Sequence, residues 1–292
     1  MINLCNMATL AFISSPVTQE NMDTVMINRN LHRLWRTICL ATFMLSLPSY
    51  SHEVEPTSTT IQSVTSSLEG QLSISKLADG VYLHHSYKNV SNFGLVEANG
   101  LVVIKDKQAF IIDTPWTDND TQKLVDWITQ QGFIPVASIS THSHQDRAGG
   151  IGYLNRQGIT TTVSETTQQI LTENDKTTAK STFTGMQYIM KTDLVEVYDL
   201  GAGHTKDNLV VWLPTQQILF GGCLIKSLNS STLGYTGEAD LQQWPLTIAK
   251  VQAQFPQVKI VVPGHGQVGD KALLEHTIEL LIPKNETVNS SS

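Results

Sequence analysis

The chain has 292 residues, of which 40% are hydrophobic and 15% charged, and its formal net charge at pH 7 is −7. This acidic balance argues against nucleic acid and anionic membrane surfaces as partners. Removal of the first 51 residues would leave 292 − 51 = 241 residues, a length that fits one large α/β domain better than two small ones.

The beginning of the chain has the layout of an export signal. Three arginines between positions 29 and 36 form a basic stretch, "TICLATFMLSL" is a short apolar core, and small residues up to Ser51 fit a cleavage site. The alternative, a buried helix of the mature fold, is disfavoured by these flanks, and the core is too short for a membrane anchor. We predict that residues 1–51 are a leader, including an over-long start, and that residues 52–292 form an exported, periplasmic domain.

Strand and helix patterns follow one another after this leader. Strand patterns are "GLVVIKDKQAFIIDT", with a turn at 105–107, then "PVASIST", "LVEVYDL", "NLVVWLP", "QQILFGG" and "KIVVPG". Helix patterns are "TQKLVDWITQQG", with Gly132 as C-cap, then "DLQQWPLTIAKVQAQF" and "DKALLEHTIELL", with Asp270 as candidate N-cap. Periodicity alone supports a mixed α/β fold. Because both halves contain strands and helices, we predict a single-domain, four-layer αββα sandwich.

Residues able to bind metal recur in one sequence context. Five of them follow an apolar run and lie within or beside glycines: His142, His144, His204, Cys223 and His265. A single histidine is more often a surface or core residue than a ligand, but five in one context are a different matter. Strand ends at one sheet edge can converge, and glycines let loops approach closely, so we expect these residues to meet.

Spacing and ligand type divide the candidates into two groups of three. The first group is His142, His144 and His204, and the second is Asp146, Cys223 and His265. Two histidines two positions apart in an extended segment point the same way. Three imidazoles with an open fourth position are typical of catalytic zinc, whereas a structural site is closed by four ligands. Two such sites leave room for a shared water whose pKa zinc lowers to about 7.

The segment "THSHQDRAGG" resembles the HxHxD signature of the metallo-β-lactamase superfamily. In hydrolases such as glyoxalase II the aspartate is followed by a ligating histidine, whereas here Arg147 stands there and "GGCLIK" supplies Cys223. That exchange resembles class B metallo-β-lactamases of the B1 type. The likeness continues through "DGVYLHHSY", "GAGHTKDNLVVWLP", "GEADLQQWP" and "VVPGHG", and so covers nearly all of the mature chain.

The resemblance implies a monomeric dinuclear zinc enzyme that confers antibiotic resistance. Metal-bound hydroxide would hydrolyse the β-lactam ring of penicillins, cephalosporins and carbapenems, with the three histidines of the first group on one zinc and the second group, including the catalytic Asp146, on the other. Lys226 would pair with the substrate carboxylate. Arg147 would neutralise anionic ligands from behind, and Asp113 would orient a ligand unless it is an ordinary turn residue.

Two positions depart from the family pattern, and two other functions compete. Tyr235 stands where many relatives carry an asparagine that polarises the lactam carbonyl, and its hydroxyl could donate instead. The flap "SYKNVSNFGLVE" would press Phe93 on hydrophobic substituents. The alternatives are a hydrolase of the same fold acting on a thioester or lactone, and a non-catalytic zinc-binding protein. Cys223 with Lys226 disfavours the first, and the complete ligand set disfavours the second.

Overall fold

Two β-sheets contain all the strands of the residues that the computed structural model describes, 68–282. The first sheet has the order β1 (Leu72–Ala78), β2 (Val81–Val90), β3 (Gly94–Lys105), β4 (Gln108–Ile112), β5 (Ile134–Ile139), β6 (Thr160–Ser164) and β7 (Ser181–Phe183). The second has the order β12 (Ile260–Pro263), β11 (Ile218–Gly222), β10 (Val210–Leu213), β9 (Val195–Tyr198) and β8 (Gln187–Lys191). The predicted leader, residues 1–51, lies outside the described residues.

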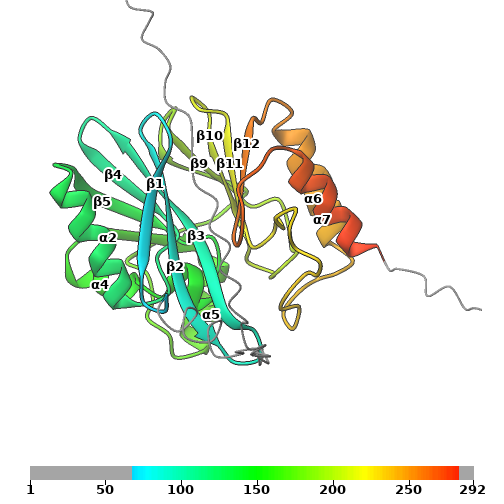
Figure 1. Cartoon of the computed structure of the whole chain (residues 1–292), viewed down its shortest axis with the longest axis horizontal. Helices are drawn as coiled ribbons and strands as arrows, with labels where there is room; N and C mark the ends of the chain where they lie inside the picture. The colour runs from blue at the N-terminus through cyan, green and yellow to red at the C-terminus, as the bar shows by residue number, and fades with distance from the viewer. Residues whose placement is uncertain (1–67, 283–292) are drawn as a thin grey trace, which may run out of the picture. The chain divides into compact units, whose positions relative to one another are not determined.

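Helices cover the outer faces of both sheets (Figure 1). They are α2 (Asp118–Gln130), α3 (Gln145–Ala148), α4 (Ile151–Arg156), α5 (Glu165–Glu173), α6 (Trp244–Gln254) and α7 (Ala272–Leu281). The first four belong with the first sheet, whereas α6 and α7 pack on the second. The predicted four-layer αββα sandwich is therefore confirmed. No helix among the described residues is both long and apolar enough to cross a membrane.

Alternation along the strands divides the core into layers. On β10, Val211 contributes to the cluster between the two sheets, while its neighbours Val210 and Trp212 pack with α6 and α7. On β3, Leu101 faces the inter-sheet cluster and Val102 faces α2. Successive side chains of a strand point to opposite faces, so these apolar runs are buried on both sides.

Strand direction brings the candidate residues to one end of the sandwich. In the first sheet β4 and β5 run parallel. In the second, β11 is parallel to β12 and antiparallel to β10, which is antiparallel to β9, so β9, β11 and β12 share one direction. The candidate residues follow β5, β9, β11 and β12. They therefore come from the carboxyl ends of strands in two facing sheets, whereas a single sheet edge was expected.

The helix ends differ in detail from the sequence predictions. The helix predicted over 240–255 begins at Trp244, because the Asp240 carboxylate accepts hydrogen bonds from the backbone N–H groups of residues 242 and 243 and holds them in a turn. Lys271 is the N-cap of α7, but Asp270 still accepts a hydrogen bond from the Ala272 N–H. Gly132 has φ +80° and lies one residue beyond the C-cap of α2, as a glycine terminator does.

His84 is a buried histidine of β2 that makes stability depend on pH. Burial lowers its pKa from 6.5 to about 3, and the ring contacts the Asp113 carbonyl oxygen. A pKa that is lower in the folded state contributes stability at pH above 6.5 that is lost as the pH falls toward 3. Lowering the pH from 7.5 to 5 should thus cost about 2 kcal/mol of unfolding free energy through this residue. Urea unfolding at both pH values measures this fall in unfolding free energy. The fall should be about 2 kcal/mol smaller in His84→Gln than in the parent protein, and equal falls in both would contradict the low pKa of His84.

Candidate metal centre

Two buried aspartates fix the segment that carries the first histidines. Asp113, at the end of β4, accepts hydrogen bonds from the N–H and the hydroxyl of Thr141, at 2.6 and 2.8 Å. Asp207 accepts a hydrogen bond from the Ser143 N–H at 2.9 Å. The residues flanking His142 are thus held from two sides. Among the described residues Asp113 makes no hydrogen bond to a histidine of the first group; it acts on the backbone beside His142, and burial raises its pKa to about 6 despite nearby Arg147.

The imidazoles of His142, His144 and His204 face one another. Their ring centroids are 4.7 to 5.2 Å apart, and their candidate ligand nitrogens all lie within 4.8 Å of one another. His204 Nε2 is 3.3 Å from His144 Nδ1, and His142 Nε2 is buried without a hydrogen-bond partner. Burial, together with the neighbouring histidines, holds the pKa of His142 well below its ordinary value. These inward-facing imidazole nitrogens fit a cation.

The second group brings together a carboxylate, a thiol and an imidazole. Cys223 Sγ lies 3.5 Å from Asp146 Oδ2 and 3.3 Å from His265 Nε2, and the latter two atoms are 3.2 Å apart. The His265 Nδ1–H donates to the Glu97 carbonyl oxygen, which leaves Nε2 directed at the other two ligand atoms. Burial lowers the pKa of His265, but Cys223 and Asp146 raise it to about 9 overall. The surroundings of this group therefore favour a positive charge.

Gly264 allows the loop after β12 to pass against Cys223. A Cβ atom at this position would lie 2.7 Å from the Cys223 backbone nitrogen and 2.8 Å from its sulfur. The Gly264 N–H donates to the Gly222 carbonyl oxygen at 2.7 Å, which joins the two loops. The glycines next to the ligand candidates therefore serve close approach, as the sequence pattern suggested.

Arg147 is completely buried behind the second group. Its guanidinium contacts Asp146 Oδ2 at 2.8 Å and Asp113 Oδ2 at 3.2 Å, and it donates to the backbone carbonyls of Asn99 and Gly264. Burial alone would raise the pKa of Asp146, but Arg147 and His265 hold it well below its ordinary value. The arginine thus keeps Asp146 ionised and ties the two sheets together.

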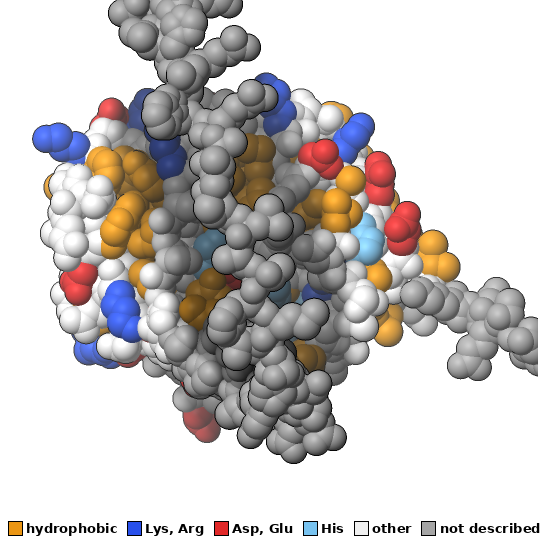
Figure 2. Space-filling view, in the orientation of Figure 1, with side chains coloured by type: hydrophobic (Ala, Val, Ile, Leu, Met, Phe, Trp, Pro, Cys, Tyr) orange, Lys and Arg blue, Asp and Glu red, His pale blue; other side chains and the backbone are white. Residues whose placement is uncertain are grey.

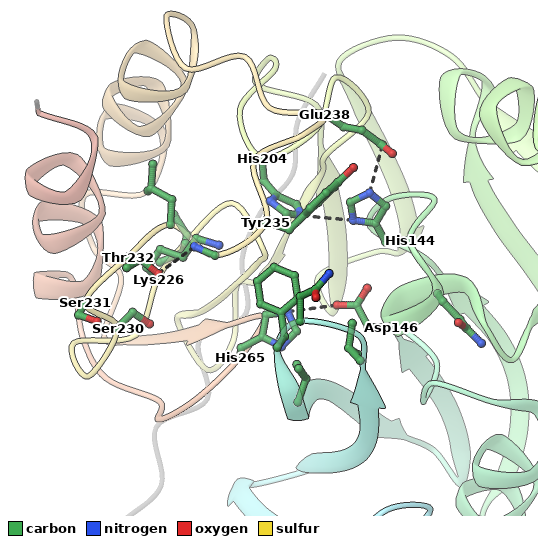
Figure 3. Close-up of a pocket in the computed structure, with 18 of the residues that line it drawn as sticks. His144, Asp146, His204, Lys226, Ser230, Ser231, Thr232, Tyr235, Glu238 and His265 are labelled. Carbon is green, nitrogen blue, oxygen red and sulfur yellow. Dashed lines mark hydrogen bonds and ion pairs between the residues drawn. The ribbon is translucent and has the colours of Figure 1, made fainter.

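A cleft of about 770 Å³ opens above both groups. Figure 3 shows His144, His204, Asp146 and His265 at its floor, with Lys226 to one side. Apolar residues form much of the rim, and Figure 2 shows histidines at the surface among hydrophobic side chains. Phe93, 51% exposed, lies in the turn between β2 and β3, where the flap was predicted. The cleft can hold a small molecule with a polar head and apolar substituents.

Comparison with known proteins decides the family. A metallo-β-lactamase type 2 of Pseudomonas aeruginosa is 42% identical over 208 residues, which are 71% of this chain and 83% of that protein. This chain belongs to the metallo-β-lactamase family. A type 2 enzyme of Bacteroides fragilis is 37% identical over 227 residues, 77% of this chain and 90% of that one. The solved structure of the DIM-1 metallo-β-lactamase is 48% identical with a TM-score of 0.71, over 72% of this chain and 96% of that one. No family model matches the chain.

Membership of the class B metallo-β-lactamases confirms the resemblance inferred from the sequence and implies that the protein depends on metal. All six predicted ligands meet in the two expected groups. Lys226 and Tyr235 both line the cleft. Lys226 is only 9% exposed because it lies beside Trp244, with Nζ 5.3 Å from the ring centroid.

Sequence reasoning missed a carboxylate beside the first group. Glu238 Oε2 lies 3.1 Å from His144 Nε2, and the Tyr235 ring packs edge-on against the same imidazole at 5.8 Å. The segment "GEADLQQWP" carried the resemblance, but nothing in its pattern indicated which residue would reach a histidine 94 positions earlier. In this metallo-β-lactamase His144 therefore has a polar partner on one ring nitrogen and the other turned to His204.

Proposed function

We propose that the protein hydrolyses the β-lactam ring of antibiotics with the help of two zinc ions. The observation that supports this proposal is that two three-residue groups of different ligand chemistry share one cleft with a buried lysine. One group offers three imidazole nitrogens, and the other an oxygen, a sulfur and a nitrogen. With three protein ligands each, both groups would leave a zinc ion a free position for water or substrate, as catalytic rather than structural zinc sites do.

The ligand roles follow from the donor sets. His142, His144 and His204 would hold one zinc, and Asp146, Cys223 and His265 the other. Bound zinc supplies an activated water at neutral pH and a Lewis acid for the amide carbonyl. Thiolate is a ligand that zinc favours, and the ionised Asp146 adds a second negative charge. Arg147 offsets part of that charge from the side away from the cleft.

The remaining roles concern the substrate. Lys226 would bind the carboxylate of penicillins, cephalosporins and carbapenems, and the cleft wall near Trp244 would orient its ammonium. Tyr235 lines the cleft beside His144, so its hydroxyl is a candidate donor to the lactam carbonyl. Phe93 would cover apolar substituents from the β2–β3 turn and help to exclude water.

Export is a separate part of the proposal. We assign residues 1–51 to a leader and residues 52–292 to a monomeric periplasmic domain, because the basic stretch and short apolar core have the order of a signal peptide. Expression of the full chain followed by osmotic release and mass spectrometry should give a species that begins near residue 52. Recovery of the uncleaved chain from the cytoplasm alone would overturn this assignment.

Lys226→Ala tests the substrate role of the lysine. A charge-assisted contact made in both ground and transition states should raise KM far more than it lowers kcat, by about ten- to a hundredfold in kcat/KM. Zinc content should be unchanged, because the side chain belongs to neither ligand group. Steady-state kinetics on a cephalosporin and on its neutral ester provide the comparison.

The ester separates carboxylate binding from damage to the loop. The increase in KM caused by Lys226→Ala should disappear on the ester, because the ester has no carboxylate to bind. Lys226→Arg should recover part of the loss on the acid, since it keeps the charge but changes its shape. Equal losses on acid and ester would show that Lys226 holds the loop rather than the substrate.

A further inference from the structure

Two helices outside the cleft hold residues 224–230, the segment that carries Lys226. On α6 the Trp244 Nε1–H donates to the Leu224 carbonyl oxygen at 2.8 Å, and the Trp244 ring lies beside the lysine ammonium. On α7 the Thr277 hydroxyl lies 2.8 Å from the Lys226 backbone nitrogen, and His276 Nε2 lies 2.8 Å from the Ser230 carbonyl oxygen. Among the described residues the cleft lining includes none from α7, and its hydrogen bonds to Lys226 and Ser230 join this helix to the cleft wall.

The geometry at Thr277 determines the direction of its hydrogen bonds. A hydroxyl has one proton, and here it is donated to the Leu273 carbonyl oxygen at 2.7 Å, one helical turn earlier. The oxygen therefore accepts from the Lys226 N–H. Thr277 is completely buried, so no water can replace it at that N–H without a rearrangement. The Leu273 carbonyl lies within the helix and is satisfied by its own backbone partner.

We propose that Thr277 is a positioning residue for Lys226, and through it a determinant of affinity for carboxylate-bearing substrates. The proposal rests on the substrate role of Lys226 given above. A buried N–H without an acceptor is unfavourable, so loss of the hydroxyl should let the backbone at Lys226 shift toward another partner. The shift would move the lysine ammonium from its place beside the Trp244 ring and out of register with the substrate carboxylate.

Thr277→Val and Thr277→Ser form the test pair. Valine keeps the branched shape and removes the hydroxyl, whereas serine keeps the hydroxyl. Valine should raise KM for the cephalosporin acid about three- to tenfold, with kcat changed less than about twofold and no effect on the ester. Serine should restore the parent KM. Thr277→Ala is measured alongside, because it removes the hydroxyl without a second methyl group and serves if the valine variant does not fold.

Hydrogen exchange provides a readout that needs no activity. The Lys226 amide should lose protection in the valine and alanine variants and keep it in the serine variant. Zinc content should equal that of the parent in all three, which excludes damage at Cys223, three residues earlier. Thr167→Val is the matched control, because Thr167 is a fully buried helical threonine whose hydroxyl, within the described part of the chain, hydrogen-bonds only to Ser164. It should leave KM and the Lys226 amide unchanged.

A double variant separates this inference from the role of Lys226 itself. In a Lys226→Ala background, Thr277→Val should raise KM no further. If Lys226→Ala distinguishes acid from ester but Thr277→Val leaves KM and amide protection as in the parent, Thr277 does not position the lysine. If Lys226→Ala raises KM equally for the acid and the ester, Lys226 does not bind the substrate carboxylate. The positioning role proposed for Thr277 is then overturned as well.

Discussion

Replacement of Cys223 by serine should weaken the binding of the second zinc by more than about a hundredfold, because loss of partners outside the ligand set alone costs about 10- to 100-fold in metal affinity. The substitution exchanges a thiolate for a hard, neutral hydroxyl in the group formed with Asp146 and His265. Turnover of a cephalosporin at limiting zinc should fall with it. A zinc titration against a competing chromogenic chelator measures the affinity directly.

The unfolding free energy of the metal-free Cys223→Ser protein provides the control. The side chain is buried and serine is nearly isosteric with cysteine. The unfolding free energy of the metal-free protein should therefore change less than the free energy of zinc binding. Parent zinc affinity and parent turnover at limiting zinc would show that Cys223 is not a ligand.

Arg147→Met should lower the unfolding free energy of the metal-free protein by about 3–5 kcal/mol, because it removes one partner of a fully buried charge network. Asp146 and Asp113 would lose their shared cation, and two backbone carbonyls would lose a donor. Urea unfolding with and without zinc is the measurement. Zinc should recover part of the loss, since a metal at Asp146 supplies positive charge there.

Arg156→Met is the matched control for Arg147. Arg156 pairs with Asp118 at 2.7 Å, but its side chain is 61% exposed, so the loss should stay within about 1 kcal/mol. Similar losses for both variants would contradict the view that Arg147 neutralises buried acids. The unfolding free energy of Arg147→Lys should lie between those of the parent and Arg147→Met, since an ammonium keeps the charge but cannot form the same fork of contacts.

The sequence was sufficient to group the six candidate ligands as the structure does, because these residues carry local signals. His142 and His144 are two positions apart after a strand, and glycines stand beside Cys223 and His265. The layers of the fold were also predictable, since apolar runs long enough for strands alternate with helical patterns. What could not be predicted depends on contacts between distant residues. The Glu238–His144 contact spans 94 positions and the Thr277–Lys226 contact 51, and neither residue has a pattern that indicates its partner.

The burial of Lys226 illustrates the same limit. A lysine next to a glycine-rich loop is ordinarily exposed, yet here the Trp244 ring and α7 enclose it. Burial lowers its pKa, although Cys223 and Asp146 act in the opposite direction. Only the packing of α6 and α7 against the second sheet creates that environment, and periodicity predicts the helices without predicting where they pack.

Hydrolysis of a chromogenic cephalosporin as zinc is returned to metal-free protein tests the central claim most directly. The metal-free protein should be inactive, and activity should rise with added zinc and level off near two ions per chain, because the six candidate ligands form two groups of three. Addition of a chelator should abolish it again. Undiminished hydrolysis by protein that contains well under one metal ion per chain would contradict the account.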